Sequence, residues 1–386
     1  MISRRRALLG LGGATLALSA CGQEEAGILT EADVHRAGYP TVEAVKWMGA
    51  EIEKATGGRL RLKPYPSGQL GAEDDSIGLA QYGAVDFARV NFAAVNNLVP
   101  ETRVLCLPFA VDSMDHLHRA VDSDVGVEIR KAFERQGLIG LAIYDAGARC
   151  FYNVRGPIHE PGDLKGLKIR SPMSDVFLKA FGAMGANPTP LAVNGVFQAL
   201  STHLIDGAEN NWPTFESARH LEIAKYWSET EHSYSPEILT MSKQRFEAMS
   251  PADRDMILDA AARSVPVMRA NWAKFSDESR AKALAQGVKA NEADREAFRK
   301  SVAELVARAQ TTGQPSCMAS STGRPKPSWV DGIKVAVACA YHAASCASLA
   351  RPSSMSVACW RISFASDSGS LWPARTSVTL PRPASI

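Results

Sequence analysis

The chain has 386 residues, of which 46% are hydrophobic and 22% are charged, and its formal net charge is +2. At roughly 150 residues per domain, this length predicts two to three domains with enough apolar side chains for sizeable cores. A charge so close to neutral, with no basic stripe beyond the first residues, argues against nucleic acid or an acidic lipid surface as the partner.

The first 21 residues have the features of a targeting segment, a signal peptide, rather than of folded structure. Arginines at 4–6, in a twin-arginine-like start, precede an apolar run over 7–20, which is shorter than the stretch of about 20 residues that a spanning helix needs. The run ends at Cys21 in a sequence similar to a bacterial lipoprotein cleavage box, which predicts lipidation of Cys21. A plain signal peptide with an incidental cysteine is the alternative. Both interpretations place the mature protein in the periplasm, with a lipid anchor in the first case.

From about residue 31 to residue 312, helix and strand signals alternate. Apolar residues at helical spacing predict a helix over 40–55 that a Gly-Gly pair ends, and alternation of leucines with charged residues predicts a half-buried strand over 59–65. Further along the chain, short apolar runs predict strands over 84–91, 103–109 and 138–144, and a helix over 125–135 lies between them. This alternation favours an α/β fold with crossover helices.

Beyond residue 235 the pattern is helical. Ser250, Pro251 and Asp253 form a helix start, because serine caps, proline fits the first helical position and aspartate faces the positive end of the macrodipole. Apolar residues continue at helical spacing as far as Trp272, although Pro266 is expected to bend or break this helix.

The segment from residue 314 to residue 386 differs in composition from the rest of the chain. It has no glutamate, has Asp331 and Asp367 as its acidic residues, and is rich in Ser, Pro, Ala, Cys and Trp without a sustained period. Such a stretch lacks a patterned face to bury, so we expect a disordered tail. We interpret it as the product of a reading-frame shift, with a functional tail as the alternative.

The region from residue 147 to residue 212 holds the residues that point to chemistry. Arg170 follows a short apolar strand pattern and precedes Ser171 and Pro172, which place it near the end of a strand, where ligands of α/β sheets collect. The planar guanidinium binds a carboxylate with two hydrogen bonds and never loses its charge. On spacing alone, an ordinary surface arginine is the alternative.

Several phrases of this region resemble the signature of the solute-binding proteins of TRAP transporters, the DctP type. They are Gly147-Ala148-Arg149, Asp163 to Pro172, Gly185 to Pro190 and Asp206-Gly207-Ala208-Glu209-Asn210-Asn211-Trp212. The resemblance covers roughly residues 31–310. It implies a two-lobed, periplasmic-binding-protein-like α/β fold with a hinge and a long helix that crosses both lobes. Lobe I would hold residues 28–147 and 236–275, and lobe II residues 148–235 and 276–313.

The resemblance also implies which residues bind the ligand. Arg170 would clamp the carboxylate of an organic acid, with Asn210 beside it and Arg149 as a second arginine near the ligand. An amide such as that of Asn210 can donate to an oxygen without adding charge. Glu209 would hold the arginine in place.

The remaining candidate ligand-binding residues are His35, Glu73, Asn91, Asn211 and Trp212. For the three in the first lobe and for Arg149, ordinary surface or structural roles are the alternative. Trp212 could stack on an apolar ligand face or pack in the core. The chain departs from the family pattern at Val193 and Gly195, where an aromatic and an acidic residue are usual. That departure weakens any inference about ligand shape at this wall.

Motifs of hydrolases, zinc proteases and nucleotide-binding enzymes do not occur, so we expect no catalytic residue, no cofactor and no metal. Cys106 and Cys150 remain in the body of the chain, and the sequence leaves open whether they pair.

The resemblance implies a monomeric receptor that delivers an organic acid to TRAP permease subunits in the membrane. A hexuronate-like sugar acid is the first expectation, and a C4-dicarboxylate or keto acid the next. The alternatives are an exported hydrolase that uses Asp145 and Glu209, and a lipid-anchored structural protein.

Overall fold

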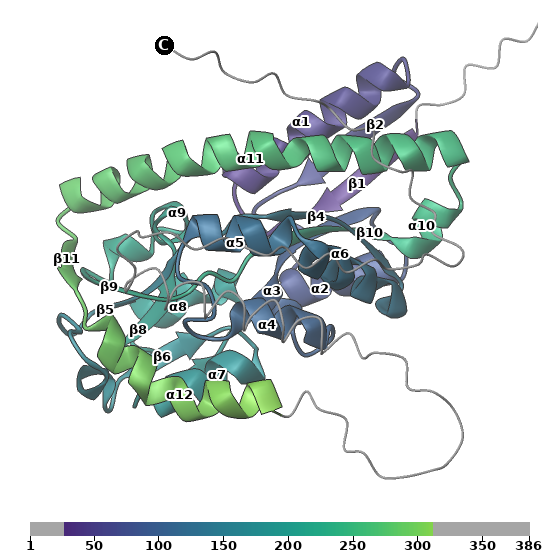
Figure 1. The fold of residues 1–386 in the computed structure, drawn as a ribbon. Helices are drawn as coiled ribbons and strands as arrows, with labels where there is room; N and C mark the ends of the chain where they lie inside the picture. Colours follow the sequence, from purple (N-terminus) through teal and green to yellow (C-terminus); the bar gives the residue numbers. More distant parts are fainter. Residues whose placement is uncertain (1–26, 312–386) are drawn as a thin grey trace, which may run out of the picture. The chain divides into compact units, whose positions relative to one another are not determined.

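The protein is described here by a computed structural model that covers residues 27–311 (Figure 1). The predicted signal peptide 1–21, the predicted lipidation of Cys21 and the predicted tail 314–386 lie outside these described residues. Within them, none of the helices combines the length and the apolar character that a membrane crossing requires.

Two mixed sheets form the framework of the described residues. The first has five strands in the order β2-β1-β3-β10-β4, and the second has six in the order β11-β9-β5-β8-β6-β7. The strands are β1 Gly27–Ala32, β2 Leu60–Tyr65, β3 Phe87–Asn91, β4 Leu138–Tyr144, β5 Arg149–Asn153, β6 Lys168–Ser171, β7 Asn187–Pro190, β8 Gly207–Asn210, β9 Tyr226–Ser233, β10 Glu237–Ser242 and β11 Lys289–Glu292.

Helices surround and connect the two sheets (Figure 1). The α-helices are α1 Pro40–Ala55, α2 Glu73–Gln81, α3 Phe92–Val95, α4 Arg103–Cys106, α5 Met114–Val121, α6 Asp124–Ala132, α7 Asp175–Ala183, α8 Val196–Ser201, α9 Trp212–Ser217, α10 Lys243–Glu247, α11 Pro251–Ala285 and α12 Arg295–Thr311. Short 3-10 turns are η1 Pro100–Thr102, η2 Phe133–Gln136, η3 Pro161–Leu164, η4 Val193–Gly195 and η5 His220–Glu222.

The chain passes directly from one sheet to the other twice, after β4 at Tyr144 and after β9 at Ser233, and a third time from β10 to β11 through α10 and α11. Below, lobe I denotes the five-stranded sheet with its helices and lobe II the six-stranded sheet with its helices. The 35-residue helix α11 contacts α1 and β4 of lobe I and α9 of lobe II, so it crosses both lobes as expected (Figure 1). The predicted division 28–147 plus 236–275 and 148–235 plus 276–313 stays a prediction.

Most predicted elements agree with the observed ones. The helix over 40–55, the strands over 59–65 and 138–144 and the helix start at Ser250 are confirmed, and the Ser250 side chain accepts a hydrogen bond from the Asp253 amide. Helix α11 also runs through Pro266, so of the two expected outcomes, a bend or a break, the break does not occur. Pro266 and Ala262, whose carbonyl loses its helical partner, both lie on the exposed side of the helix, where water can satisfy that carbonyl.

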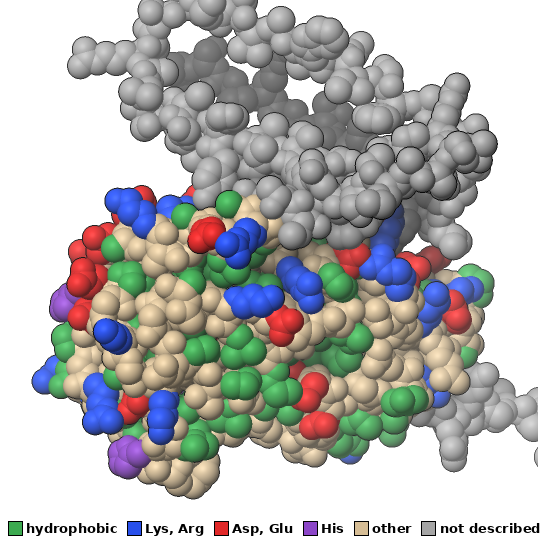
Figure 2. Space-filling model, turned by 90° about the horizontal axis from the view of Figure 1, so that it is seen from below, with side chains coloured by type: hydrophobic (Ala, Val, Ile, Leu, Met, Phe, Trp, Pro, Cys, Tyr) green, Lys and Arg blue, Asp and Glu red, His purple; other side chains and the backbone are tan. Residues whose placement is uncertain are grey.

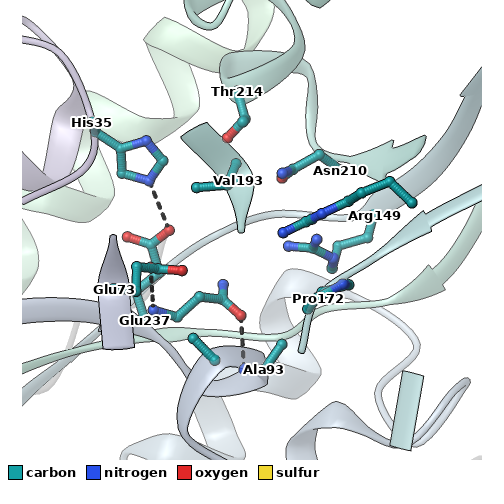
Figure 3. Close-up of a pocket in the computed structure, with 12 residues that line it drawn as sticks. His35, Glu73, Ala93, Arg149, Pro172, Val193, Asn210, Thr214 and Glu237 are labelled. Atoms are coloured by element: carbon teal, nitrogen blue, oxygen red, sulfur yellow. Dashed lines mark hydrogen bonds and ion pairs between the residues drawn. The ribbon is translucent and has the colours of Figure 1, made fainter. Parts of the chain in front are cut away.

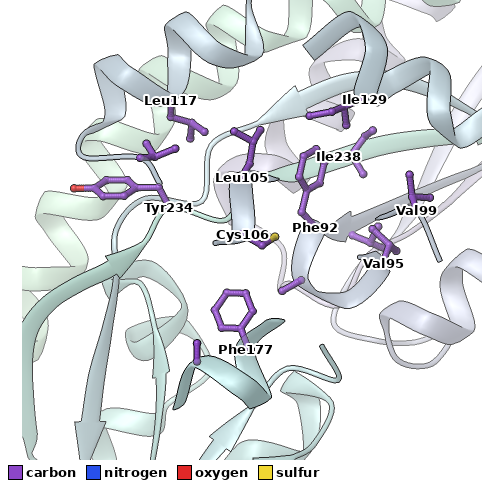
Figure 4. Packing of buried hydrophobic residues seen from close by; sticks show 14 of the residues in the cluster. Phe92, Val95, Val99, Leu105, Cys106, Leu117, Ile129, Phe177, Tyr234 and Ile238 are labelled. Carbon is purple, nitrogen blue, oxygen red and sulfur yellow. The ribbon is translucent and has the colours of Figure 1, made fainter. Parts of the chain in front are cut away.

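The strand predicted over 103–109 was also wrong, because this segment forms helix α4 and a turn. Leu105 and Cys106 of α4 are buried and lie near Phe177 of α7, as Figure 4 shows. A short apolar run has no period that separates a buried helical turn from a buried strand, so packing between the lobes decides the structure here.

The largest apolar cluster is shared between the lobes. It joins Phe92 and Ile238 of lobe I to Phe151, Phe177 and Phe181 of lobe II. Figure 4 shows Phe92, Ile238 and Phe177 of this cluster. Fully burying a side chain of this size contributes about 1.5–3 kcal/mol, so the shared cluster is a substantial contact between the two sheets. On the outer face seen in Figure 2, positive and negative side chains are interspersed among hydrophobic ones.

Candidate functional site

A pocket of about 340 Å³, including the part open to solvent, lies between the two sheets. Lobe I supplies His35, Glu73, Asn91, Ala93, Ala94 and Glu237 to its lining, and lobe II supplies Arg149, Arg170, Pro172, Val193, Asn210 and Thr214. Figure 3 shows the acidic side chains of lobe I on one side and Arg149 and Asn210 on the other. A second hollow shares Arg170, Pro172 and Val193 with this pocket and extends past Met173, which is exposed.

Three neighbouring strands position the polar groups of lobe II. Strand β8 lies between β5, which runs antiparallel to it, and β6, which runs parallel to it. The start of β5 and the ends of β6 and β8 therefore share one sheet edge, and these positions hold Arg149, Arg170 and Asn210. Residues far apart in the chain thus meet because of the strand order.

Arg149 is held by Glu209 in a two-pronged ion pair. Its Nε lies 2.6 Å from Glu209 Oε2 and its Nη2 lies 2.7 Å from Oε1, and both side chains are buried. Burial raises the pKa of Glu209, but the charge of Arg149 and the contact with His232 outweigh it and lower the pKa to about 2. The pair is therefore ionised, and Glu209 neutralises Arg149.

Arg170 has a different environment, although it is equally close to the pocket. Its Nε donates to the Leu191 carbonyl at 2.7 Å, and its closest carboxylate among the described residues is Glu209, whose Oε1 lies 3.9 Å from Nη1. Burial lowers the pKa of Arg170 and the positive charge of Arg149 acts in the same direction, against Glu209. An arginine nevertheless stays charged in proteins. Arg170 is thus a buried cation that lines the pocket without a closely bound counter-ion from residues 27–311.

Asn210 ends β8 and also lines the pocket. Its Oδ1 accepts from the Asn211 amide at 2.9 Å, which orients the side chain. Its Nδ2 has no acceptor among residues 27–311, so the amide group can donate to a ligand beside Arg170.

Lobe I surrounds one buried arginine, Arg89, with carboxylates. Arg89 Nε donates to Asp33 at 3.0 Å, its Nη2 also pairs with Asp33, and its Nη1 donates to Glu73 at 2.9 Å. Nη1 also lies 3.3 Å from Oε2 of Glu237. Burial raises the pKa of Glu237, but Arg89 and His35 lower it more, and the net pKa lies below the usual range. This face therefore carries more negative than positive charge.

His35 and Asn91 complete the wall of lobe I. His35 Nε2 lies 3.2 Å from Glu237 Oε1, as Figure 3 shows, and its ring stacks on Tyr39 with centroids 3.7 Å apart. Asn91 accepts from the Ala93 amide at 2.9 Å as the cap of α3, and its Nδ2 donates to the Ser235 carbonyl. Both residues line the pocket while they also hold the surrounding chain in place.

The structure does not bring every sequence-predicted residue to the pocket. Six of them line it: His35, Glu73, Asn91, Arg149, Arg170 and Asn210. Trp212 instead packs in the core of lobe II, where it stacks on Trp227 with centroids 3.8 Å apart. Asn211 caps α9 by accepting from the Thr214 amide and donates to the Ala146 carbonyl. Glu209, expected to hold Arg170, pairs mainly with Arg149.

Sequence reasoning missed Glu237 and Thr214. Glu237 is the first residue of β10, opposite Asn91 in the register, and Thr214 lies in α9 with its Oγ1 3.0 Å from the Tyr39 hydroxyl. Neither stands in a motif that marks a ligand site. An acidic residue directly before two large apolar ones, as in Glu237-Ile238-Leu239, was the one available signal.

The carboxylates considered for a hydrolase do not line the pocket that the described residues form. Asp145 lies at the first change of sheet, 3.0 Å from His118 Nε2, and burial raises its pKa against the effects of His118 and Arg269. Glu209 is fully engaged by Arg149. Cys106 and Cys150 are both buried free thiols, which answers the open question of their pairing.

Hydrogen bonds connect the two lobes on both sides of the pocket. Asn96 Nδ2 donates to Ser174 Oγ at 2.7 Å, and both side chains are fully buried. Tyr39 and Thr214 form a second connection, and Arg36 pairs with Glu216 at 3.1 Å. In this structure the lobes are therefore in contact around the pocket.

Comparisons with known proteins agree with this architecture. The DctP family, described as bacterial extracellular solute-binding protein, family 7, matches residues 32–312. A solute-binding protein from Chromohalobacter salexigens is 38% identical over 262 residues, which cover 68% of this chain and 78% of that protein. A TRAP periplasmic solute binding protein from a Bradyrhizobium species, in complex with α/β-D-galacturonate, is 44% identical with a TM-score of 0.71, and the match covers 72% of this chain and 94% of that one.

A second such protein, from Xanthobacter autotrophicus with bound β-D-galacturonate, is 37% identical with a TM-score of 0.74. The match covers 81% of this chain and 99% of that one. The two-lobed fold expected from the sequence is thereby confirmed.

Proposed function

The chain belongs to the DctP family of bacterial extracellular solute-binding proteins, family 7, and from this we propose that it is the solute receptor of a TRAP transporter for a hexuronate. It would capture the sugar acid in the periplasm and deliver it to the permease subunits in the membrane. The family and its solved relatives are binding receptors rather than enzymes, and the proposal contains no chemical step.

The observation that carries the proposal is the state of Arg170. It is a buried guanidinium at the pocket, and the closest carboxylate among the described residues is 3.9 Å away. A buried cation without a close partner is costly, and an anion from outside can neutralise it. A carboxylate fits this need because it accepts two parallel hydrogen bonds from a guanidinium. Hydrogen bonds to charged groups contribute about 1.5–3 kcal/mol each, so two suffice to orient a small acid.

Arg149 and Asn210 would complete the carboxylate site. Arg149 remains a donor although Glu209 neutralises it, and Asn210 offers its Nδ2 without a further charge. Movement of the lobes about the two direct changes of sheet would close the pocket on the ligand and exclude water, which strengthens the ion pairs. The bond between Asn96 and Ser174 would favour the closed arrangement.

A hexuronate is the preferred ligand for two reasons. The similar Bradyrhizobium and Xanthobacter proteins hold galacturonate. In addition, the wall of lobe I offers acceptors, which suit the donating hydroxyl groups of a sugar.

Calorimetric titration of the full chain tests this proposal. D-Galacturonate and D-glucuronate should bind one to one, whereas D-galactose, which lacks the carboxylate, should bind at least about 100-fold more weakly because two charged hydrogen bonds are lost. Succinate and pyruvate test the other organic acids. A methyl glycoside of galacturonate, which carries a hydrolysable bond, should be recovered unchanged after incubation, whereas its cleavage would favour a hydrolase. Equal binding of galactose and galacturonate, or no binding of any acid, would contradict the proposal.

A further inference from the structure

We propose that lobe I makes this receptor selective for sugar acids with one carboxylate and excludes the corresponding aldaric diacids, because Glu73 and Glu237 occupy the wall that a second carboxylate would face. The inference rests on the proposed function and assigns a specificity-determining role to these two residues. Figure 3 shows them on the side of the pocket opposite Arg149 and Asn210.

Glu237 has acceptor capacity that the surrounding protein does not use. It is 2% exposed and lines the pocket. Its Oε1 faces His35, whereas its Oε2 accepts no hydrogen bond within the described part of the chain and has only the ion contact of 3.3 Å with Arg89. Oε2 is itself shielded from solvent, so Glu237 acts on a ligand through its negative charge, which favours a hydroxyl donor over a second anion. A ligand carboxylate has no proton to donate.

Glu73 offers a second acceptor beside it. Its Oε1 accepts both the Arg89 Nη1 bond at 2.9 Å and the Asn91 amide bond at 2.8 Å. Its Oε2 accepts no hydrogen bond from residues 27–311, and the side chain borders both hollows of the site. Glu73 is therefore fixed by one oxygen and presents the other to a ligand.

The charge balance of the two lobes decides how many carboxylates the pocket accepts. In lobe II, Arg149 and Arg170 exceed Glu209 by one positive charge. In lobe I, three carboxylates face the single guanidinium of Arg89: Asp33, Glu73 and Glu237. The first ligand carboxylate thus neutralises lobe II. A second one, carried on the far end of the same sugar, meets a surplus of negative charge, which repels it.

The experiment compares D-galacturonate with galactarate, the diacid with the same hydroxyl configuration, by calorimetric titration of the full chain. We expect galactarate to bind at least about 100-fold more weakly than galacturonate, since placing like charges side by side is strongly unfavourable. Binding of the two acids within about threefold of each other would overturn this inference and leave the proposed function intact. Binding of neither acid would overturn both.

Two neutral variants, Glu73→Gln and Glu237→Gln, locate the selectivity. A glutamine keeps an acceptor oxygen for the protein donors and removes the charge, so each variant should reduce the ratio of galacturonate to galactarate affinity by at least about tenfold. The matched control is Glu101→Gln, a buried carboxylate of lobe I that pairs with Arg135 away from the pocket lining, and it should leave the ratio unchanged. Two variants are used because one can fail to fold. An unchanged ratio in the folded Gln variants would overturn the assignment.

Discussion

In lobe II, the two arginines that line the pocket share one carboxylate behind them, whereas in lobe I one buried arginine contacts three carboxylates. Arg89 is fully buried and satisfied by its own lobe, so it is structural in spite of its charge. Arg170 is almost as buried but lacks a close carboxylate among the described residues. Under the proposed function, the arginine without a close counter-ion, rather than any buried arginine, would mark the anion site.

The largest expected effect comes from removing the carboxylate that balances lobe II. Glu209→Gln leaves Arg149 buried beside Arg170 without its counter-ion, so we expect the free energy of unfolding to fall by about 3–5 kcal/mol. Denaturant titration of the variant and the parent protein measures this difference in the free energy of unfolding. Added galacturonate should restore more stability in this variant than in the parent protein.

The matched control for that variant is Glu222→Gln, which removes a carboxylate from an exposed pair with Arg219. It should leave the free energy of unfolding unchanged within error, because exposed pairs contribute little. If Glu209→Gln were as stable as this control, Glu209 would not neutralise the arginines of lobe II.

A second prediction concerns pH and the charge of lobe II. Burial, followed by the charge of Arg170, lowers the pKa of His220 to about 3 from the usual 6.5, and burial also lowers the pKa of His232. Both histidines are therefore neutral in the folded protein near neutral pH. Below pH 6.5 these two imidazoles bind protons more readily in the unfolded chain than in the folded protein. Their contribution to stability is therefore complete above pH 6.5 and is lost as the pH falls.

Between pH 6.5 and 5, His220 should reduce the free energy of unfolding by up to about 1.4 kcal/mol per pH unit, and His232 acts in the same direction. The variant His220→Asn, whose Oδ1 can take the place of Nδ1 beside the Tyr152 hydroxyl, should lower the slope of stability against pH by up to about 1.4 kcal/mol per pH unit. Denaturant titrations at several pH values measure the slope. The same slope in variant and parent would mean that His220 is already protonated in the fold.

The smallest expected effect lies where the two lobes touch. Asn96→Ala removes the buried 2.7 Å bond to Ser174 and should weaken galacturonate binding by about fivefold, the equivalent of one ordinary hydrogen bond of about 1 kcal/mol. The control Asn97→Ala removes a longer, exposed bond of 3.3 Å to the Met173 carbonyl and should change affinity less. Affinities in the opposite order would contradict a role of the buried contact in closure.

The pocket walls of lobe I and lobe II also differ in how well the sequence predicted their residues. Arg149, Arg170 and Asn210 stand in short local phrases, and the strand order of lobe II brings those phrases to one edge. Glu237 lies far from any such phrase, and its place opposite Asn91 follows from the return of β10 into the sheet of lobe I, which spacing does not reveal. Trp212 was ambiguous because an aromatic side chain suits a core as well as a ligand, and its stacking on Trp227 decides for the core.

Likewise, the sequence predicted an element correctly where interactions between neighbouring residues determine the structure. Ser250 caps α11 as expected because the cap needs only neighbouring residues. The segment 103–109 was misread because its structure depends on burial between the lobes, and the helix continues through Pro266 where the Ala262 side is exposed. Tertiary contacts of this kind are not encoded in a short window.

The most direct test of the account is calorimetric titration of D-galacturonate into Arg170→Ala and into the control Arg219→Ala, which removes an exposed arginine paired with Glu222. We predict that Arg170→Ala loses at least about 100-fold in affinity, because two charged hydrogen bonds disappear, while the control binds like the parent protein. Parent-like affinity of a folded Arg170→Ala variant would contradict the claim that this guanidinium holds the carboxylate.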